Sequence, residues 1–127
     1  MRINLRKYEG QRIKIRATIR NIGTNKKNKK QYCIELADTK DAIFNTPLTD
    51  HIWIRIGKQI VKDEPNISRG DVVEFMAKVK GYTKNKEIHD YGLFNITQFR
   101  IVNKDSKFNN IPFIKCELET YNIIATF

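Results

Sequence analysis

The feature that most restricts the fold is a strict alternation of residue types between positions 11 and 21. Isoleucine or alanine occupies every odd position from 13 to 19, and cations dominate the even positions: Arg12, Lys14, Arg16 and Arg20. Successive side chains of a β-strand point to opposite faces, and β-branched residues are favoured there. The segment is therefore predicted to be a half-buried strand with a row of cations on its outward face.

Four further segments have the composition or the period of strands. They cover residues 32–38, 51–56, 72–82 and about 91–103, and residues 58–64 are expected to form two turns of helix at most. The alternation places Cys33, Glu35 and Trp53 on outward faces. In the last strand both Phe94 and Phe99 look inward, which predicts a bulge near residues 97 and 98.

The order of these segments defines the expected fold class. Strands and helices do not alternate, which argues against a parallel doubly wound sheet. We expect an all-β fold, a five-stranded antiparallel barrel with a short helix between strands three and four, because closure removes exposed edges. A two-layer sandwich is the alternative.

The net charge of +10 is confined to the first quarter of the chain. Residues 1–30 hold 11 Lys and Arg against one acidic residue, whereas residues 31–127 hold 13 of each sign. A segregated block of one sign indicates an interaction surface, and a polyanion such as nucleic acid is the simplest partner. A solvated basic face without a partner is the alternative.

The outward cations of residues 11–21 recur about every 6.5–7 Å, close to the distance between successive phosphates. They are predicted to follow a nucleic-acid backbone. The polar loop that comes next adds four lysines suited to electrostatic attraction without base reading: Lys26, Lys27, Lys29 and Lys30.

Residues 8–103 resemble an OB-fold nucleic-acid-binding domain. The resemblance rests on the strand order, Gly10 before the first strand, the connection between strands three and four, and the run RGDVVEFMAKV at residues 69–79. In that fold, ligands lie across strands two and three and are clasped by two loops. The resemblance implies that the ligand meets Trp53, Arg55, the lysines of the first loop and a second-loop set: Tyr82, Lys84, Lys86 and Tyr91.

Trp53 is the only tryptophan of the chain. A base stacked on such a ring gains roughly 1–3 kcal/mol. The alternative is that Trp53 covers the end of the barrel or packs under the C-terminal segment.

Residues 104–127 form an apolar C-terminal extension to the predicted domain at residues 1–103. The extension has no glycine and is expected to be ordered, either as a seal on the barrel or as a docking surface for a partner. The residues that would dock the partner are Phe108, Ile111, Phe113, Tyr121 and Phe127.

Nothing in the sequence indicates catalysis. There is no phosphate-binding glycine loop and no clustered metal-ligand motif, so we expect a non-enzyme without cofactor or metal. The charged first residues, the lack of a long apolar run and the distant Cys33 and Cys116 predict a cytoplasmic protein that is not inserted in a membrane.

The leading hypothesis is a non-catalytic OB-fold protein that binds single-stranded or primer–template DNA as an accessory subunit of a replication or priming complex. In size and strand plan the chain also resembles small OB-type accessory subunits encoded beside polymerases on bacterial mobile elements, which implies a polymerase or other replication protein as partner. The alternatives are a protein-interaction adaptor or inhibitor of a nucleic-acid enzyme, and an RNA-binding module.

Overall fold

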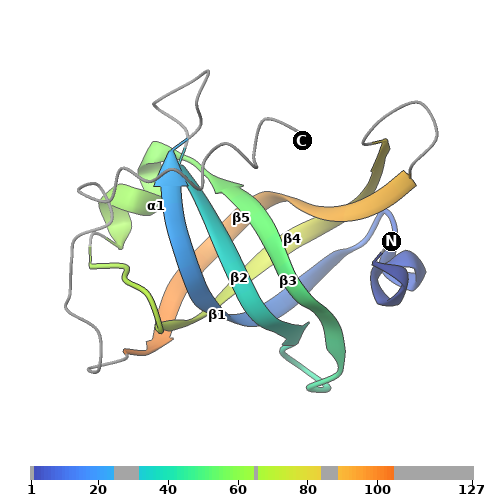
Figure 1. Ribbon diagram of the computed structural model, residues 1–127, viewed down its shortest axis with the longest axis horizontal. Coiled ribbons are helices and arrows are strands. Elements are labelled where there is room, and N and C mark those ends of the chain that lie inside the picture. The colour runs from blue at the N-terminus through green and yellow to red at the C-terminus, as the bar shows by residue number, and fades with distance from the viewer. Residues whose placement is uncertain (1, 25–31, 65, 84–88, 105–127) are drawn as a thin grey trace.

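A computed structural model describes residues 2–24, 32–64, 66–83 and 89–104 (Figure 1). The elements follow in the order η1 (Ile3–Tyr8, a 3-10 helix), β1 (Arg12–Thr24), β2 (Tyr32–Asp41), β3 (Pro47–Ile56), α1 (Lys58–Asp63), β4 (Val72–Thr83) and β5 (His89–Asn103). The predicted five strands and the short helix between β3 and β4 are confirmed. The η1 helix was not predicted, and β3 begins four residues earlier than its pattern indicated.

The five strands form one antiparallel sheet in the order β3-β2-β1-β4-β5. The central strand β1 pairs with β4 from Arg12 to Thr18 and with β2 from Ile15 to Thr24, and the sheet curls around it (Figure 1). The expected closure into a barrel is not found. The edge strands β3 and β5 lie against each other, but no backbone ladder joins them in the described part of the chain.

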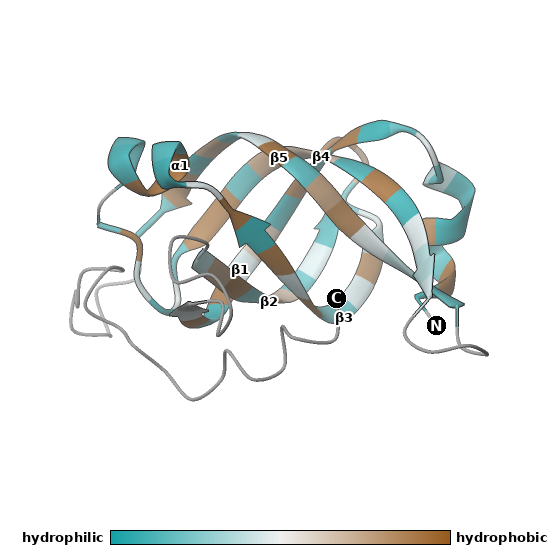
Figure 2. Ribbon diagram, turned by 90° about the horizontal axis from the view of Figure 1, so that it is seen from above, coloured by the Kyte–Doolittle hydropathy of each residue, from teal (hydrophilic) through white to brown (hydrophobic). Residues whose placement is uncertain are grey.

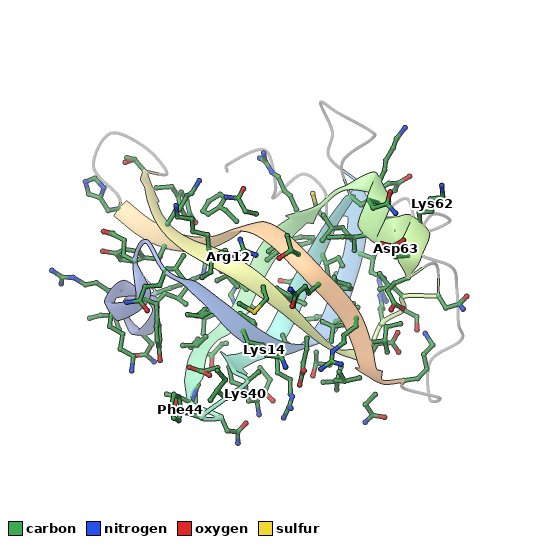
Figure 3. The ribbon with its side chains drawn as sticks, turned by 180° about the vertical axis from the view of Figure 1, so that it is seen from behind. Arg12, Lys14, Lys40, Phe44, Lys62 and Asp63 are labelled. Carbon is green, nitrogen blue, oxygen red and sulfur yellow. The ribbon has the colours of Figure 1, made fainter. Side chains whose placement is uncertain are left out.

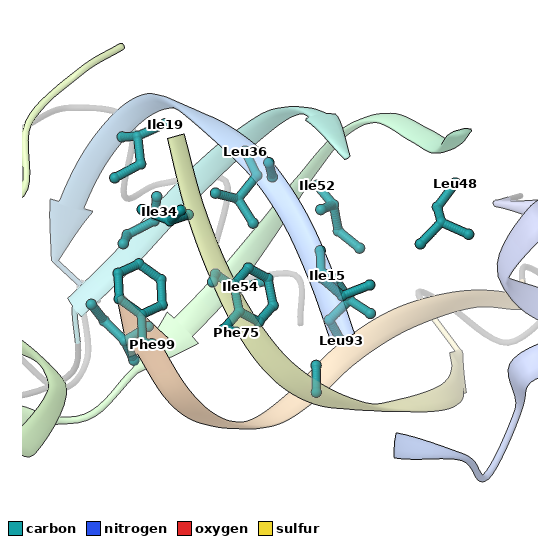
Figure 4. Packing of buried hydrophobic residues seen from close by; sticks show 14 of the residues in the cluster. Ile15, Ile19, Ile34, Leu36, Leu48, Ile52, Ile54, Phe75, Leu93 and Phe99 are labelled. Atoms are coloured by element: carbon teal, nitrogen blue, oxygen red, sulfur yellow. The ribbon is translucent and has the colours of Figure 1, made fainter. Parts of the chain in front are cut away.

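The hydrophobic core fills the concave side of the curled sheet. The odd positions 13 to 19 of β1 and 73 to 79 of β4 are all buried, as the alternation predicted. Figure 2 shows the resulting change between hydrophilic and hydrophobic residues along the strands. In the interior, Ile15, Leu36 and Phe75 point toward one another, and Phe75 stacks on Phe99 with ring centroids 5.7 Å apart (Figure 4).

The irregularity predicted in the last strand is present. The β4–β5 register shifts on both sides of Met76, and Asn95 and Gln98 have positive φ angles of 53°. Such extra residues change the phase of a strand relative to its partner. The placement of Phe94 in the core was wrong, because Leu93 takes the buried position and Phe94 is only partly buried.

The two helices lie at opposite ends of the curled sheet (Figure 1). Leu5 of η1 is fully buried, and the preceding Arg2 binds Asp90 of β5 through its backbone nitrogen at 2.7 Å and its guanidinium at 3.2 Å. At the α1 end, the buried carboxylate of Asp71 accepts hydrogen bonds from the Ser68 backbone and from Lys104. These contacts close both ends of the core.

No helix among the described residues is long and apolar enough to cross a membrane. The predicted C-terminal extension, apart from Lys104, lies outside the described residues, and so do its five proposed docking residues.

Candidate nucleic-acid interface

The outer face of β2 and β3, expected to be the ligand platform, is largely covered. Trp53 is only 4% exposed, and Cys33 and Glu35 are also buried, so the prediction of open outward side chains was wrong for these three. Trp53 and Cys33 nevertheless stay outside the main core cluster, as the alternation of residues along β2 and β3 predicted. Only Arg55 of the predicted platform is exposed.

The environment of Cys33 is correspondingly unfavourable to charge. Burial raises the pKa of its thiol to about 12, although the nearby Arg55 guanidinium acts in the opposite direction. Cys33 is therefore a neutral packing residue at physiological pH and not a reactive thiolate.

A hollow of about 220 Å³ lies at the seam between the two edge strands. Its lining joins Trp53 and Arg55 of β3 to residues from β4 and β5: Lys80, Leu93, Phe94 and Asn95. The Lys80 ammonium lies 5.9 Å from the centre of the Phe94 ring. The predicted site residues Trp53 and Arg55 thus share a hollow with the ring of Phe94 and with Lys80, a cation that sequence reasoning did not include.

The cation row of β1 is shorter than predicted. Arg12, Lys14 and Arg16 point outward and remain at least partly exposed. Arg20 follows the point at which β1 stops pairing with β4, and a register shift there turns it toward Glu35 of β2, at 3.9 Å. Three of the four predicted side chains therefore lie on one face.

Cations from β4 and β5 extend this row. Lys78 lies opposite Arg12 in the β1–β4 ladder, Lys80 follows it outward, and Arg100 lies opposite Glu74 in the β4–β5 ladder. We call this set the cationic face: Arg12, Lys14, Arg16, Lys78, Lys80 and Arg100. Figure 3 views the molecule from this side, with Arg12 and Lys14 labelled.

One carboxylate organises the centre of the cationic face. Glu74, 4% exposed, accepts hydrogen bonds from Arg16 and Arg100 and lies 3.5 Å from the Lys14 ammonium. The hydrogen bond from Arg16 has the largest effect on the Glu74 pKa and lowers it. Burial acts in the opposite direction, and the hydrogen bond from Arg100 and the charges of Arg16 and Lys14 add to the lowering, which brings the pKa to about 2. Glu74 stays ionised and neutralises one charge of six, which leaves the face with a net charge of +5.

Arg12 is fixed in a different way. Its guanidinium reaches over β4 and donates to the backbone oxygen of Asn95 at 3.1 Å and to the hydroxyl of Thr97. On the same face, a hollow of about 320 Å³ is lined by Lys14, Met76, Gln98 and Arg100 among others. The bulged segment of β5 therefore positions a cation and shapes the surface next to it.

The aromatic residues of the predicted second loop have structural contacts. The Tyr82 hydroxyl accepts a hydrogen bond from Arg2 at 3.0 Å, and its ring meets Phe94 edge to face. Tyr91 packs partly buried against the core. The remaining predicted loop residues lie outside the described part of the chain: Lys26, Lys27, Lys29, Lys30, Lys84 and Lys86.

Sequence reasoning missed Lys78, Lys80 and Arg100. The alternation of residues 72–82 already placed the two lysines outward, so their omission was avoidable. The position of Arg100 beside Glu74 depends on the bulged register of β5, which the sequence pattern does not specify.

Within the described residues, no group of three or more His, Cys, Asp or Glu side chains is placed to hold a metal ion. No protein-family model, curated protein or solved structure matches the chain.

Proposed function

We propose that this protein is a non-catalytic, OB-type nucleic-acid-binding protein whose cationic face carries a single strand or a primer–template junction of DNA. The observation that supports the proposal is the gathering of six cations from β1, β4 and β5 on one outward face, three of them in contact with the Glu74 carboxylate. In this proposal the protein acts in the cytoplasm as an accessory subunit of a replication or priming complex, with a polymerase or other replication protein as its partner.

The strand arrangement supports the OB-type part of the proposal. A five-stranded, partly open barrel built around a first strand that pairs on both sides agrees with the order β3-β2-β1-β4-β5 and with the helix between β3 and β4. The cationic face, however, lies on β1, β4 and β5, away from the β2–β3 face that such domains commonly use. We therefore assign the backbone contacts to the cationic face.

The proposed mechanism is electrostatic. Phosphates displace condensed counterions when they meet Lys and Arg side chains, and the gain in entropy drives binding without regard to sequence. Arg16 and Arg100 are oriented by Glu74, and a guanidinium that gives two N–H groups to a carboxylate retains others for a phosphate. The face is thus ordered before the strand arrives.

The decisive experiment is a salt titration of binding to a single-stranded oligonucleotide of mixed sequence. With about six phosphates engaged, log K is expected to fall against log salt with a slope of roughly −4. The triple variant Arg12→Gln, Lys14→Gln and Lys78→Gln is expected to reduce the magnitude of that slope by roughly 2 and to weaken all sequences alike.

The matched control removes three exposed cations elsewhere: Lys58→Gln, Lys62→Gln and Arg69→Gln. It is expected to keep most of the original slope. A salt-independent interaction, or equal losses in the two triple variants, would overturn the proposed interface. Parallel titrations with RNA and with duplex DNA test the choice of single-stranded DNA.

A further inference from the structure

The turn between β2 and β3 displays two large apolar side chains. Ile43 is 71% exposed and Phe44 is 77% exposed, although most apolar residues of the sheet are buried. Neither residue belongs to the core cluster or packs against it. Contiguous exposed apolar side chains are one mark of an interaction site.

Hydrogen bonds hold this turn in one shape. The Asp41 carboxylate accepts from the backbone nitrogens of Ile43 at 2.7 Å and Phe44 at 3.2 Å, and the Asp41 carbonyl accepts from Asn45 at 2.8 Å. The Tyr8 hydroxyl donates to the second oxygen of the Asp41 carboxylate. The buried Asp41 therefore fixes the backbone that carries Phe44, so little conformational entropy is lost when a ligand meets the ring.

The turn is joined directly to the cationic face. The backbone nitrogen of Ala42 donates to the carbonyl of Lys14 at 3.0 Å, and Lys40 lies opposite Arg16 in the β1–β2 ladder. Figure 3 shows Lys14, Lys40 and Phe44 following one another at this edge of the molecule. A strand whose phosphates lie on the cationic face would meet the exposed ring as it leaves that face.

We infer that Phe44 is a base-stacking residue, which receives an unpaired base of the strand whose phosphates contact Lys14 and its neighbours. This inference rests on the proposed function. Charge favours a nucleic acid over a protein as the occupant, because the ring adjoins the cationic face with its net charge of +5, whereas the Asp41 carboxylate is engaged by the turn and by Tyr8. Stacking on a flat ring tolerates any base, which suits binding without sequence preference.

The test compares an oligothymidylate with an abasic oligonucleotide of the same length and phosphate number. Phe44→Ala is expected to weaken oligothymidylate binding by about fivefold to 150-fold, and to leave abasic binding nearly unchanged. Phe44→Leu, which keeps an apolar side chain but removes the ring, is expected to behave like Phe44→Ala. Val102→Ala, at another exposed apolar residue near the end of β5, serves as the control and should bind both strands normally.

The outcomes separate the inference from the function on which it rests. Equal binding of oligothymidylate by the native protein and by Phe44→Ala overturns the stacking role but leaves the cationic face intact. An equal loss on both oligonucleotides also overturns it, because a base contact cannot act on an abasic strand. Self-association that Phe44→Ala abolishes, measured by sedimentation without nucleic acid, would reassign the turn as a contact between copies. Absence of salt-sensitive binding to either strand removes the proposed function itself.

Discussion

The guanidinium of Arg16 binds the Glu74 carboxylate through two of its nitrogens, with Nε at 2.8 Å and Nη2 at 2.5 Å from Oε2. Arg100 occupies the other carboxylate oxygen at 2.9 Å. The three side chains come from three adjacent strands, so the contact joins β1, β4 and β5 on their outward side. The same contact that stabilises the sheet also sets the position of two proposed phosphate ligands.

Replacing Glu74 is therefore expected to affect folding and binding in opposite directions. Glu74→Gln should lower the free energy of unfolding by about 1–2 kcal/mol, since hydrogen bonds to charged groups weaken but the arginines are partly solvated. It should also make the salt dependence of DNA binding steeper, because one compensating negative charge disappears from the face. Urea denaturation and salt titration measure the two effects.

Glu35→Gln is the matched control for this variant. Glu35 is also buried and bonded, but to Asn21 at 2.7 Å on the outer face of β2. Its loss should reduce stability without changing the salt dependence. A Glu74→Gln protein with weaker, less salt-sensitive binding would contradict the proposed role of the carboxylate.

The low pKa of Glu74 predicts a specific loss of stability in acid. The group has a pKa of about 2 in the fold against an ordinary value of 4.5, so the unfolded chain takes up a proton first as the pH falls. The stabilisation from the ionised carboxylate is complete above about pH 5 and declines as the pH falls from 4.5 toward 2. In urea titrations, the difference between the native protein and Glu74→Gln should be constant from pH 7 to 5 and shrink below that. A difference that persists unchanged at pH 3 would refute the assignment.

Cys33 predicts a loss of stability at the opposite end of the pH scale. Burial raises its pKa to about 12 from 9.0, so above pH 9 the unfolded chain loses a proton that the folded chain retains. Stability should fall as the pH rises above 9, and Cys33→Ala should remove that part of the decline. Mass spectrometry of thiol labelling at pH 8 should find Cys33 protected until the protein unfolds. Rapid labelling of native Cys33 would contradict the buried placement.

The burial of Trp53 predicts a structural phenotype. Trp53→Ala should reduce stability by about 3–5 kcal/mol through the cavity it leaves, and Trp53→Phe should reduce it by less. The fluorescence of the single tryptophan should be blue-shifted and poorly quenched by acrylamide in the native protein. Emission at the wavelength of a solvated indole would show that the ring is open to solvent.

The alternation rule predicted β1 and β4 well because both strands keep a period of two while one face is buried. The rule failed to predict the burial of Trp53 and Cys33. Alternation along a strand shows which face of the sheet a side chain occupies, but it does not show what covers that face. The η1 helix was missed for a related reason. A single 3-10 helix has too few turns to display a period, and Leu5 is its only fully buried residue.

The candidate site was predictable to the extent that it depended on single strands. The outward cations of β1 follow from their spacing alone, and Lys78 and Lys80 follow from that of β4. The neighbours of Glu74 depend on how three strands align, and the alignment of β5 with β4 is set by register shifts on both sides of Glu74. The exposed ring of Phe44 depends on the hydrogen bonds to Asp41, which no periodic pattern records.

The two-sided character of β1 links the layout of charge to the existence of the fold. From Arg12 to Ile19, the isoleucines of β1 occupy odd-numbered positions and face the core, whereas its basic side chains occupy even-numbered positions and face outward. Deleting one residue near the start of β1 would exchange them downstream, sending guanidinium groups inward and hydrocarbon outward. Lysine and arginine can therefore replace each other on the outer face of β1, but a one-residue insertion or deletion within the strand would disrupt the hydrophobic core and the cationic face together.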